Sequence, residues 1–229
     1  MTPVRKQTRM HTATILVVDD DASVRVALSR LLMSVGYRVE TFAGAAEFLE
    51  RAPRTVRGCI VLDVKMPVTS GFELQRQLGA AGIDLPVIFL SAHVDVPLTV
   101  NAMKGGAFEV IIKPFDEDHL LDAVRNAVEQ DRMRDLQRIE NEQLRQLLDA
   151  ISPRERTVMS LVVTGMRNKE IAAILGISEK TVKVHRAHVM TKMQASSLPD
   201  LVRIGDRLGL RPDIPVDNSV QANPFKQLG

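Results

Sequence analysis

Four short apolar runs in the first half of the chain each end in a side chain that could take part in phosphoryl chemistry. Asp19 and Asp20 follow the run 15–18, Asp63 follows 60–62, Ser91 follows 87–90, and Lys113 follows 110–112. Carboxylates that meet at one place repel one another unless a cation neutralises them, and hard oxygen ligands suit Mg²⁺. A carboxylate beside a divalent cation can attack a phosphoryl group, because that reaction needs mainly positioning and neutralisation of charge. The spacing therefore makes Asp63 a candidate nucleophile.

The same four runs are apolar on both faces, which indicates buried strands of a parallel sheet with helices on each side. The carboxyl ends of such strands share one edge of the sheet, and ligands bind there. Amphipathic helices are expected over 23–33, 45–51, 71–78, 97–103 and 116–129. With right-handed crossovers, this alternation predicts an α/β fold, a flavodoxin-like (βα)5 doubly wound parallel sheet.

The sequence pattern of the second half of the chain predicts only helices. No Gly or Pro occurs between residues 116 and 150, so one long helix could run out of the first domain as a linker. Its apolar positions form no clean heptad, which favours a solvated spacer over a stable coiled coil, with partial coiling on dimerisation as the alternative. Ser152 and Pro153 are typical of a new helix start, and Gly176 separates a helix at 168–175 from a longer one that Ser178 caps. This pattern predicts an all-α helix-turn-helix domain.

Composition divides the chain into two parts with different partners. At 229 residues it is long enough for two modest domains. Residues 13–130 carry 16 acidic and 11 basic side chains, whereas residues 152–211 carry 11 basic and 5 acidic ones, which predicts a cation for the first part and a polyanion for the second. The single cysteine, Cys59, is expected in the core. Since no run approaches a membrane span and no signal peptide is evident, a cytoplasmic location without a membrane partner is expected.

The ordered motifs ILVVDDD, VLDVKMP, VIFLSAH and FEVIIKPF resemble the receiver domain of two-component response regulators. The segment 152–193, which begins SPRERTVMSL and ends HRAHVMTKM, is similar to the LuxR-type helix-turn-helix. Together with SAHVDVPLTVNAMKGGA, these motifs resemble the FixJ-type, StyR-like branch of the NarL/FixJ family over residues 14–210. The resemblance implies a DNA-binding transcription factor rather than an enzyme. A histidine kinase would phosphorylate it to control dimerisation and transcription, usually activation with RNA polymerase.

The resemblance also implies roles in the acidic pocket. Asp63 would accept the phosphoryl group, Asp20 and Asp63 would bind Mg²⁺ or Mn²⁺ directly, and Asp19 would bind it through water. The backbone carbonyl of Lys65 would complete the protein ligands, while Ser91 and Lys113 would contact the phosphoryl oxygens. The chain departs from the family at Val110, where an aromatic switch residue is common. The side chains of Lys65 and His93 would flank the path of the attacking water and so affect the rate of dephosphorylation.

For the DNA-binding domain, the resemblance places base contacts on the long helix that ends near Met193. The expected base-contacting residues are Lys183, Val184 and Ala187, with Lys180 on the same outer face. Phosphate contacts are expected from Asn168, Lys169, Thr181, Arg186, His188 and Lys192. A closing helix at 199–208 should expose Leu201 and Ile204 for dimerisation. The predicted divisions are a flexible tail 1–12, a receiver 13–130, a helical linker 131–151, the helix-turn-helix domain 152–211 and a disordered tail 212–229.

Two other functions compete with this interpretation. The sequence from Asp19 to Ser23 also fits the DxDx[ST] opening of haloacid-dehalogenase-type phosphatases, in which Asp19 would be the nucleophile and Asp21 the acid-base. No second acidic metal motif follows within the same domain, which disfavours that enzyme. A DNA-binding protein with a vestigial, unphosphorylated receiver is the third hypothesis, and the presence of every acidic-pocket residue disfavours it.

Overall fold

The computed structural model describes residues 13–53, 55–92, 100 and 102–211. Contacts between residues divide the chain into two compact units, 1–136 and 137–229, and each is described by itself. None of the described helices is both long and apolar enough to cross a membrane.

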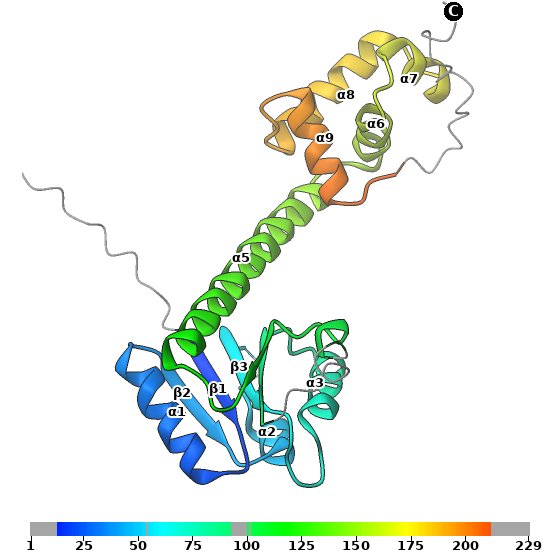
Figure 1. Ribbon diagram of the computed structural model, residues 1–229. Helices are drawn as coiled ribbons and strands as arrows, with labels where there is room; N and C mark the ends of the chain where they lie inside the picture. Colours follow the sequence, from blue (N-terminus) through cyan, green and yellow to red (C-terminus); the bar gives the residue numbers. More distant parts are fainter. Residues whose placement is uncertain (1–12, 54, 93–99, 101, 212–229) are drawn as a thin grey trace, which may run out of the picture. The chain divides into compact units, whose positions relative to one another are not determined.

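The first unit contains one parallel sheet of five strands in the order β2-β1-β3-β4-β5. The strands are β1 Thr14–Val18, β2 Arg38–Phe42, β3 Gly58–Asp63, β4 Val87–Ser91 and β5 Glu109–Ile112 (Figure 1). The helices between and after them are α1 Ala22–Ser34, α2 Ala45–Arg51, α3 Gly71–Ala80 and α5 Glu117–Asp149. This topology confirms the predicted flavodoxin-like fold. The helix expected at 97–103 falls largely outside the described residues.

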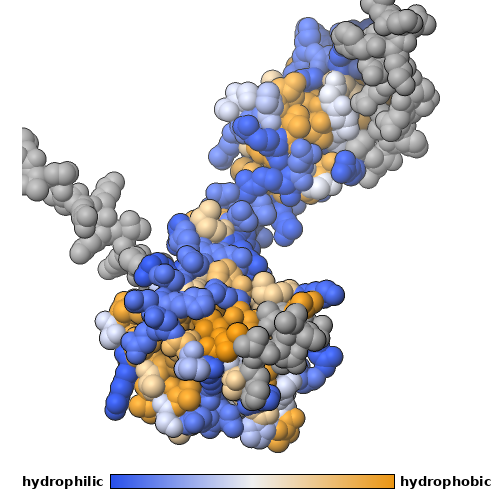
Figure 2. Space-filling view, in the orientation of Figure 1, coloured by the Kyte–Doolittle hydropathy of each residue, from blue (hydrophilic) through white to orange (hydrophobic). Residues whose placement is uncertain are grey.

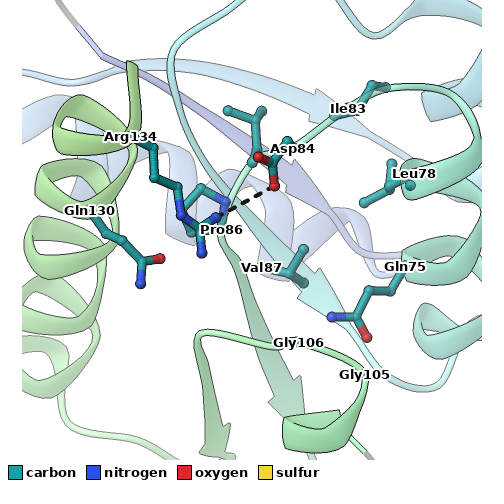
Figure 3. A pocket seen from close by; sticks show the side chains of 12 residues that line it. Gln75, Leu78, Ile83, Asp84, Pro86, Val87, Gly105, Gly106, Gln130 and Arg134 are labelled. Carbon is teal, nitrogen blue, oxygen red and sulfur yellow. Dashed lines mark ion pairs between the residues drawn. The ribbon is translucent and has the colours of Figure 1, made fainter. Parts of the chain in front are cut away.

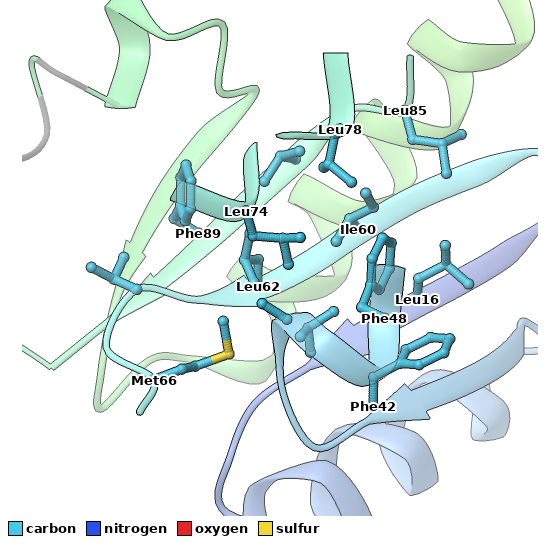
Figure 4. Close-up of a cluster of buried hydrophobic side chains, with 14 of the residues drawn as sticks. Leu16, Phe42, Phe48, Ile60, Leu62, Met66, Leu74, Leu78, Leu85 and Phe89 are labelled. Atoms are coloured by element: carbon cyan, nitrogen blue, oxygen red, sulfur yellow. The ribbon is translucent and has the colours of Figure 1, made fainter. Parts of the chain in front are cut away.

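Two apolar layers hold the sheet between its helices. On one face, α2 and α3 pack over the sheet, and the side chains of this cluster include Leu16, Phe48, Ile60, Leu74 and Phe89 (Figure 4). On the other face, α1 and α5 contribute Leu28, Leu32, Leu120 and Val124 to a second cluster with alternate residues of the same strands. Strands β1 and β3 are buried along their whole length, because they are central and covered on both sides. Cys59, on β3, is buried as expected.

The expectation of a fully buried strand at 110–112 was wrong in part. Strand β5 lies at the edge of the sheet, and only Ile111 of its residues is buried, whereas 39% of Ile112 is exposed. An edge strand has a neighbour on one side only, so helices cover it less completely than the central strands. Ile112 is therefore an apolar surface residue of this unit.

A single helix, α5, spans 33 residues, as the lack of Gly and Pro predicted. Near its middle, the buried Asp131 accepts hydrogen bonds from the Arg57 guanidinium (3.1 Å) and from the Gly58 N–H (3.0 Å), at the start of β3. Figure 2 shows that the exposed surface farther along α5 is largely hydrophilic, in keeping with a solvated spacer. The Asp131 contacts thus tie α5 to the edge of the sheet opposite Asp63.

A cavity of about 280 Å³ lies at that same opposite edge, between α3, the segment before β4 and α5 (Figure 3). At its rim, Arg134 of α5 lies 3.5 Å from Asp84. Both side chains are largely exposed, so this pair adds little to stability. The Asp131 contacts therefore do more than the Arg134–Asp84 pair to fix this part of α5.

Besides the C-terminal part of α5, the described residues of the second unit form a helix-turn-helix domain with the helices α6 Pro153–Val163, α7 Asn168–Leu175, α8 Glu179–Lys192 and α9 Leu198–Arg207. Ser152 caps α6, α7 ends at Gly176, and Ser178 caps α8, as predicted, and Glu155 completes a capping box with Ser152. The domain core includes Val158, Leu161, Ile171, Val182 and Val189.

The expected exposure of Leu201 and Ile204 was wrong. Both side chains are buried in the core of the second unit, at 2% and 8% exposed. The reason is close packing of α9 on α6: a Cβ atom at Gly205 would lie 2.8 Å from a methyl group of Val163, so only glycine permits this approach. The apolar residue that α9 does expose is Leu198, at 42%.

Candidate functional site

Two carboxylates and one ammonium group meet at the carboxyl edge of the sheet. Asp63 ends β3, Asp19 follows β1, and Lys113 follows β5. The Nζ atom of Lys113 lies 2.9 Å from Asp19 Oδ2 and 2.7 Å from Asp63 Oδ1. Both aspartates are buried, at 2% and 7% exposed. The structure therefore brings together three of the residues that the sequence predicted for this site.

Backbone N–H groups fix the second oxygen of each aspartate. The N–H of Lys65 donates to Asp63 Oδ2 (2.7 Å), and the N–H of Asp21 donates to Asp19 Oδ1 (2.9 Å). Helix α3 begins directly against the end of β3, where a Cβ atom at Gly71 would lie 2.4 Å from the carbonyl oxygen of Asp63. Only glycine permits this contact. Asp63 is thus held by both its side chain and the close start of the next helix.

Burial and the ion pairs change the proton affinities in this pocket. Burial raises the pKa of the Asp63 carboxyl, and the hydrogen bond from Lys113 opposes that rise without cancelling it. For Lys113, burial acts to lower the pKa, but the bonds to Asp63 and Asp19 outweigh it and the pKa is raised. Lys113 therefore remains an ammonium ion at neutral pH. Two carboxylates share that one positive charge, so the pocket favours further cations.

The other predicted residues of the pocket lie beside this group. Ser91 ends β4 and is buried, and its carbonyl oxygen accepts a hydrogen bond from the Lys113 N–H (2.7 Å). Val110 is partly buried on β5, and His93 lies outside the described residues. Asp20 is exposed, and in the described part of the chain its carboxylate takes part in no hydrogen bond or ion pair.

The donor set of the pocket suits a hard divalent cation. Asp19 and Asp63 already hold a cationic group between them, and carboxylate oxygens are the ligands that Mg²⁺ prefers. Within residues 13–53, 55–92, 100 and 102–211, however, no three His, Cys, Asp or Glu side chains gather closely enough to hold a metal. A site of three carboxylates thus requires Asp20 to turn its side chain toward the other two.

One residue of this edge was missed in the sequence. The guanidinium of Arg25, on α1, donates from one nitrogen to the carbonyl oxygens of Asp19 (2.7 Å) and Asp20 (3.0 Å). A bond to a backbone carbonyl requires no particular residue type in its partner, so no pattern in the sequence indicated it. The only signal was an arginine in the second turn of a helix that begins beside the acidic residues.

The phosphatase hypothesis fits this geometry poorly. It requires Asp21 as an acid-base, but Asp21 caps α1 by accepting hydrogen bonds from the side chain and the N–H of Ser23. The Ser23 hydroxyl contributes most to lowering the pKa of Asp21. A carboxyl group that donates protons near neutral pH needs a raised pKa instead.

On the second unit, α8 presents the surface predicted for DNA. Val182 and Val189 face the core, while the residues exposed on the outside include Lys180, Thr181, Lys183, Val184 and Ala187. Lys169, on α7, is exposed as well. This exposure leaves the predicted base-contacting residues accessible.

Several of the predicted phosphate contacts already have partners within the unit. Arg186 donates to Asn168 Oδ1 (3.0 Å). The buried Glu155 accepts from Lys192 Nζ (2.7 Å), and His188 Nδ1 lies 3.4 Å from the same carboxylate. Glu155 thus joins the start of α6 to two residues of α8. Contact of these side chains with phosphate stays a prediction.

Comparison with known protein families gives two matches. The response regulator receiver domain matches residues 15–125, and the luxR family of bacterial regulatory proteins matches residues 149–204. The two matches fall on the sheet unit and on the helix-turn-helix unit respectively.

Individual relatives match both halves together. Nodulation protein W of Bradyrhizobium diazoefficiens is 46% identical over 198 residues, which cover 86% of this chain and 87% of the relative. The transcriptional regulatory protein FixJ of Azorhizobium caulinodans is 44% identical over 196 residues, covering 86% and 93%. Among solved structures, the response regulator StyR shares 46% identity and a TM-score of 0.72, covering 86% of this chain and 99% of its own.

Proposed function

The chain belongs to the transcriptional response regulators of two-component systems, in the FixJ-type branch, and we propose that phosphorylation of Asp63 switches its activity on DNA. The observation that supports this most directly is the buried group of Asp19, Asp63 and Lys113 at the carboxyl edge of the receiver sheet. A sensor histidine kinase would supply the phosphoryl group, and promoter DNA would be the target.

The proposed reaction is an attack on phosphorus by a carboxylate oxygen of Asp63. The new P–O bond forms as the P–N bond to the kinase histidine breaks, and the imidazole leaves. Asp20, Asp63 and the carbonyl oxygen of Lys65 would hold Mg²⁺ or Mn²⁺, with Asp19 acting through water, and that cation supplies neutralisation of charge. The receiver would also catalyse its own phosphorylation and dephosphorylation.

Lys113 and Ser91 would detect the product. Lys113 now shares its ammonium between two carboxylates, and conversion of Asp63 to an acyl phosphate would remove the carboxylate charge while adding phosphoryl oxygens. Lys113 would then bind a phosphoryl oxygen, and the Ser91 hydroxyl would turn toward another. Because both residues lie at the ends of β4 and β5, their movement would reach the surface of β5 and α5.

The output would be a homodimer that binds promoter DNA in the cytoplasm through α8 and promotes transcription with RNA polymerase. Lys183, Val184 and Ala187 would enter the major groove, with Lys180 beside them. The remaining predicted contacts, Asn168, Lys169, Thr181, Arg186, His188 and Lys192, would hold the phosphates and set the register.

The test is phosphorylation of the full chain by acetyl phosphate with Mg²⁺, followed by intact-mass measurement. The wild type should gain one phosphoryl group, and Asp63→Asn should gain none, because an amide cannot form an acyl phosphate. Asp84→Asn, an exposed aspartate at the opposite edge of the sheet, is the control and should label like the wild type. A full adduct on Asp63→Asn would exclude Asp63 as the nucleophile, and an unlabelled wild type would favour the vestigial receiver.

A further inference from the structure

Asp20 differs from the other two acidic residues of the pocket in how it is held. The Asp19 and Asp63 carboxylates are buried and bound to Lys113 and to backbone N–H groups. Asp20 is exposed, with no hydrogen bond or ion pair on its carboxylate in the described part of the chain. The direction in which the Asp20 carboxylate points is therefore set by the backbone of Asp20 and its χ angles alone.

The backbone of Asp20 is held on both sides by one side chain. The carbonyl of Asp19 belongs to the peptide group that precedes the Asp20 Cα atom, and the carbonyl of Asp20 belongs to the one that follows it. Arg25 donates to both, at 2.7 Å and 3.0 Å. Each peptide group is planar, so fixing the two groups fixes the φ and ψ angles between them. Arg25, together with the bond from the Asp21 N–H to Asp19 Oδ1, thus fixes the direction of the Asp20 Cβ atom.

We propose that Arg25 is a positioning residue of the cation site, which holds the backbone of Asp20 so that its carboxylate can complete the ligands offered by Asp19 and Asp63. This inference rests on the proposed function, because it assumes that a divalent cation binds there. Arg25 contacts neither the cation nor the phosphoryl group in this proposal. It acts only through the two peptide groups beside Asp20.

The charge of Arg25 has the opposite effect on cation affinity. A guanidinium ion near the pocket repels a divalent cation, so removal of its charge alone would tighten Mg²⁺ binding. Loss of positioning would weaken Mg²⁺ binding, as replacement of groups that orient metal ligands typically does by about 10-fold to 100-fold. The direction of the change in affinity therefore separates the two effects.

The experiment measures the Mg²⁺ dissociation constant of the full chain by calorimetric titration without a phosphodonor. We compare the wild type with Arg25→Ala, and with Arg30→Ala as the control, because Arg30 is an exposed arginine of the same helix. Arg25→Ala should weaken Mg²⁺ binding about 10-fold, and Arg30→Ala should leave it unchanged. The increase in melting temperature that Mg²⁺ causes should shrink in Arg25→Ala and should stay at its wild-type size in Arg30→Ala.

Equal or tighter Mg²⁺ binding by Arg25→Ala would overturn the proposal. If Arg25→Ala does not fold, as judged by circular dichroism without Mg²⁺, Arg25→Lys decides by the same criterion. Lysine keeps the charge but lacks the rigid guanidinium, so weaker binding by Arg25→Lys supports positioning, and equal or tighter binding contradicts it. Failure of the proposed function looks different, because the wild type itself would then bind no Mg²⁺ and accept no phosphoryl group.

Discussion

Two lysines of this chain bind buried carboxylates, with different consequences. Lys113 is shared between Asp19 and Asp63, so the receiver pocket remains rich in negative charge. Lys192 binds the single buried carboxylate of Glu155. The hydrogen bond from Lys192 and that from the Ser152 N–H hold the pKa of Glu155 at about 2, well below its ordinary 4.5. Glu155 is thus a stabilising charge of the second unit, whereas burial raises the pKa of Asp63.

The lowered pKa of Glu155 predicts how acid affects the second unit. The unfolded chain binds a proton near pH 4.5 and the folded unit near pH 2, so the stabilisation is complete above pH 4.5 and is lost as the pH falls from 4.5 toward 2. Lys192→Met should destabilise fragment 137–229 at neutral pH and flatten this acid dependence. Urea unfolding followed by circular dichroism at a series of pH values measures both effects.

The control for Lys192→Met is Lys169→Met, which removes an exposed lysine of α7. It should leave the free energy of unfolding nearly unchanged at every pH. An identical acid dependence in wild type and Lys192→Met would show that this ion pair does not set the pKa of Glu155. Because Lys192 stabilises the fold, loss of DNA affinity on its replacement would not by itself identify a phosphate contact.

At the scale of elements, the central strands and the capped helices were predictable from the sequence. Strands β1 and β3 are continuous apolar runs, and α6, α7 and α8 begin and end at residues with clear capping preferences. The edge position of β5 and the burial of α9 were not predictable, because both depend on which neighbours an element acquires in the fold. In the site, Asp63 and Lys113 follow from their places after strands, but the Arg25 bonds to backbone carbonyls leave no pattern in residue type.

Two aspartates of helix α5 contact the base of the sheet: Asp131, which is buried, and Asp135, which pairs with Arg57 at 2.6 Å. Asp131→Ala should lower the free energy of unfolding of the receiver by about 1–3 kcal/mol, because the Gly58 N–H loses its acceptor and the Arg57 guanidinium keeps only its pair with Asp135. Hydrogen exchange should rise most in peptides that cover 131–136. Asp122→Ala, which breaks only an exposed pair with Arg125 on the same helix, should change stability by less than about 0.5 kcal/mol. Equal exchange in both variants would show that the Asp131 contacts are not needed to hold α5 on the sheet.

The outer face of α8 should separate specificity from affinity. Lys183 is exposed on α8, so Lys183→Ala should cost about 1–3 kcal/mol of binding free energy at the cognate site and reduce discrimination at one base pair. Lys169 lies on α7, so Lys169→Ala should weaken binding to all DNA sequences similarly. It should also lower the slope of log affinity against log salt concentration by roughly one. Binding to cognate and scrambled duplexes over a range of salt concentrations measures both. Uniform loss from Lys183→Ala would mean that another face of α8 enters the groove.

At the scale of the whole molecule, the two units carry opposite excess charge and separate cores, so a signal must pass from an acidic pocket to a basic helix. A change in the number of chains that associate is one way to carry it, because a dimer presents two recognition helices to two half-sites. The receiver has apolar residues on its surface that could serve, among them Val100, Met103 and Ile112. All three lie on or beside the segments that follow β4 and β5, which movement of Ser91 and Lys113 would displace.

Phosphorylated protein should therefore form dimers through this surface, and Met103→Glu should prevent them. The side chain of Met103 is half exposed, so a glutamate there folds without strain but places two like charges in a symmetric interface. Met33→Glu is the matched control, because Met33 is an equally exposed methionine on α1, away from that surface. Sedimentation velocity with acetyl phosphate and Mg²⁺ should show dimers for the wild type and Met33→Glu and monomers for Met103→Glu, with equal phosphoryl content by mass. If all three proteins form dimers, the interface lies on another surface. If all three are phosphorylated but stay monomeric, the signal reaches α8 within a single chain.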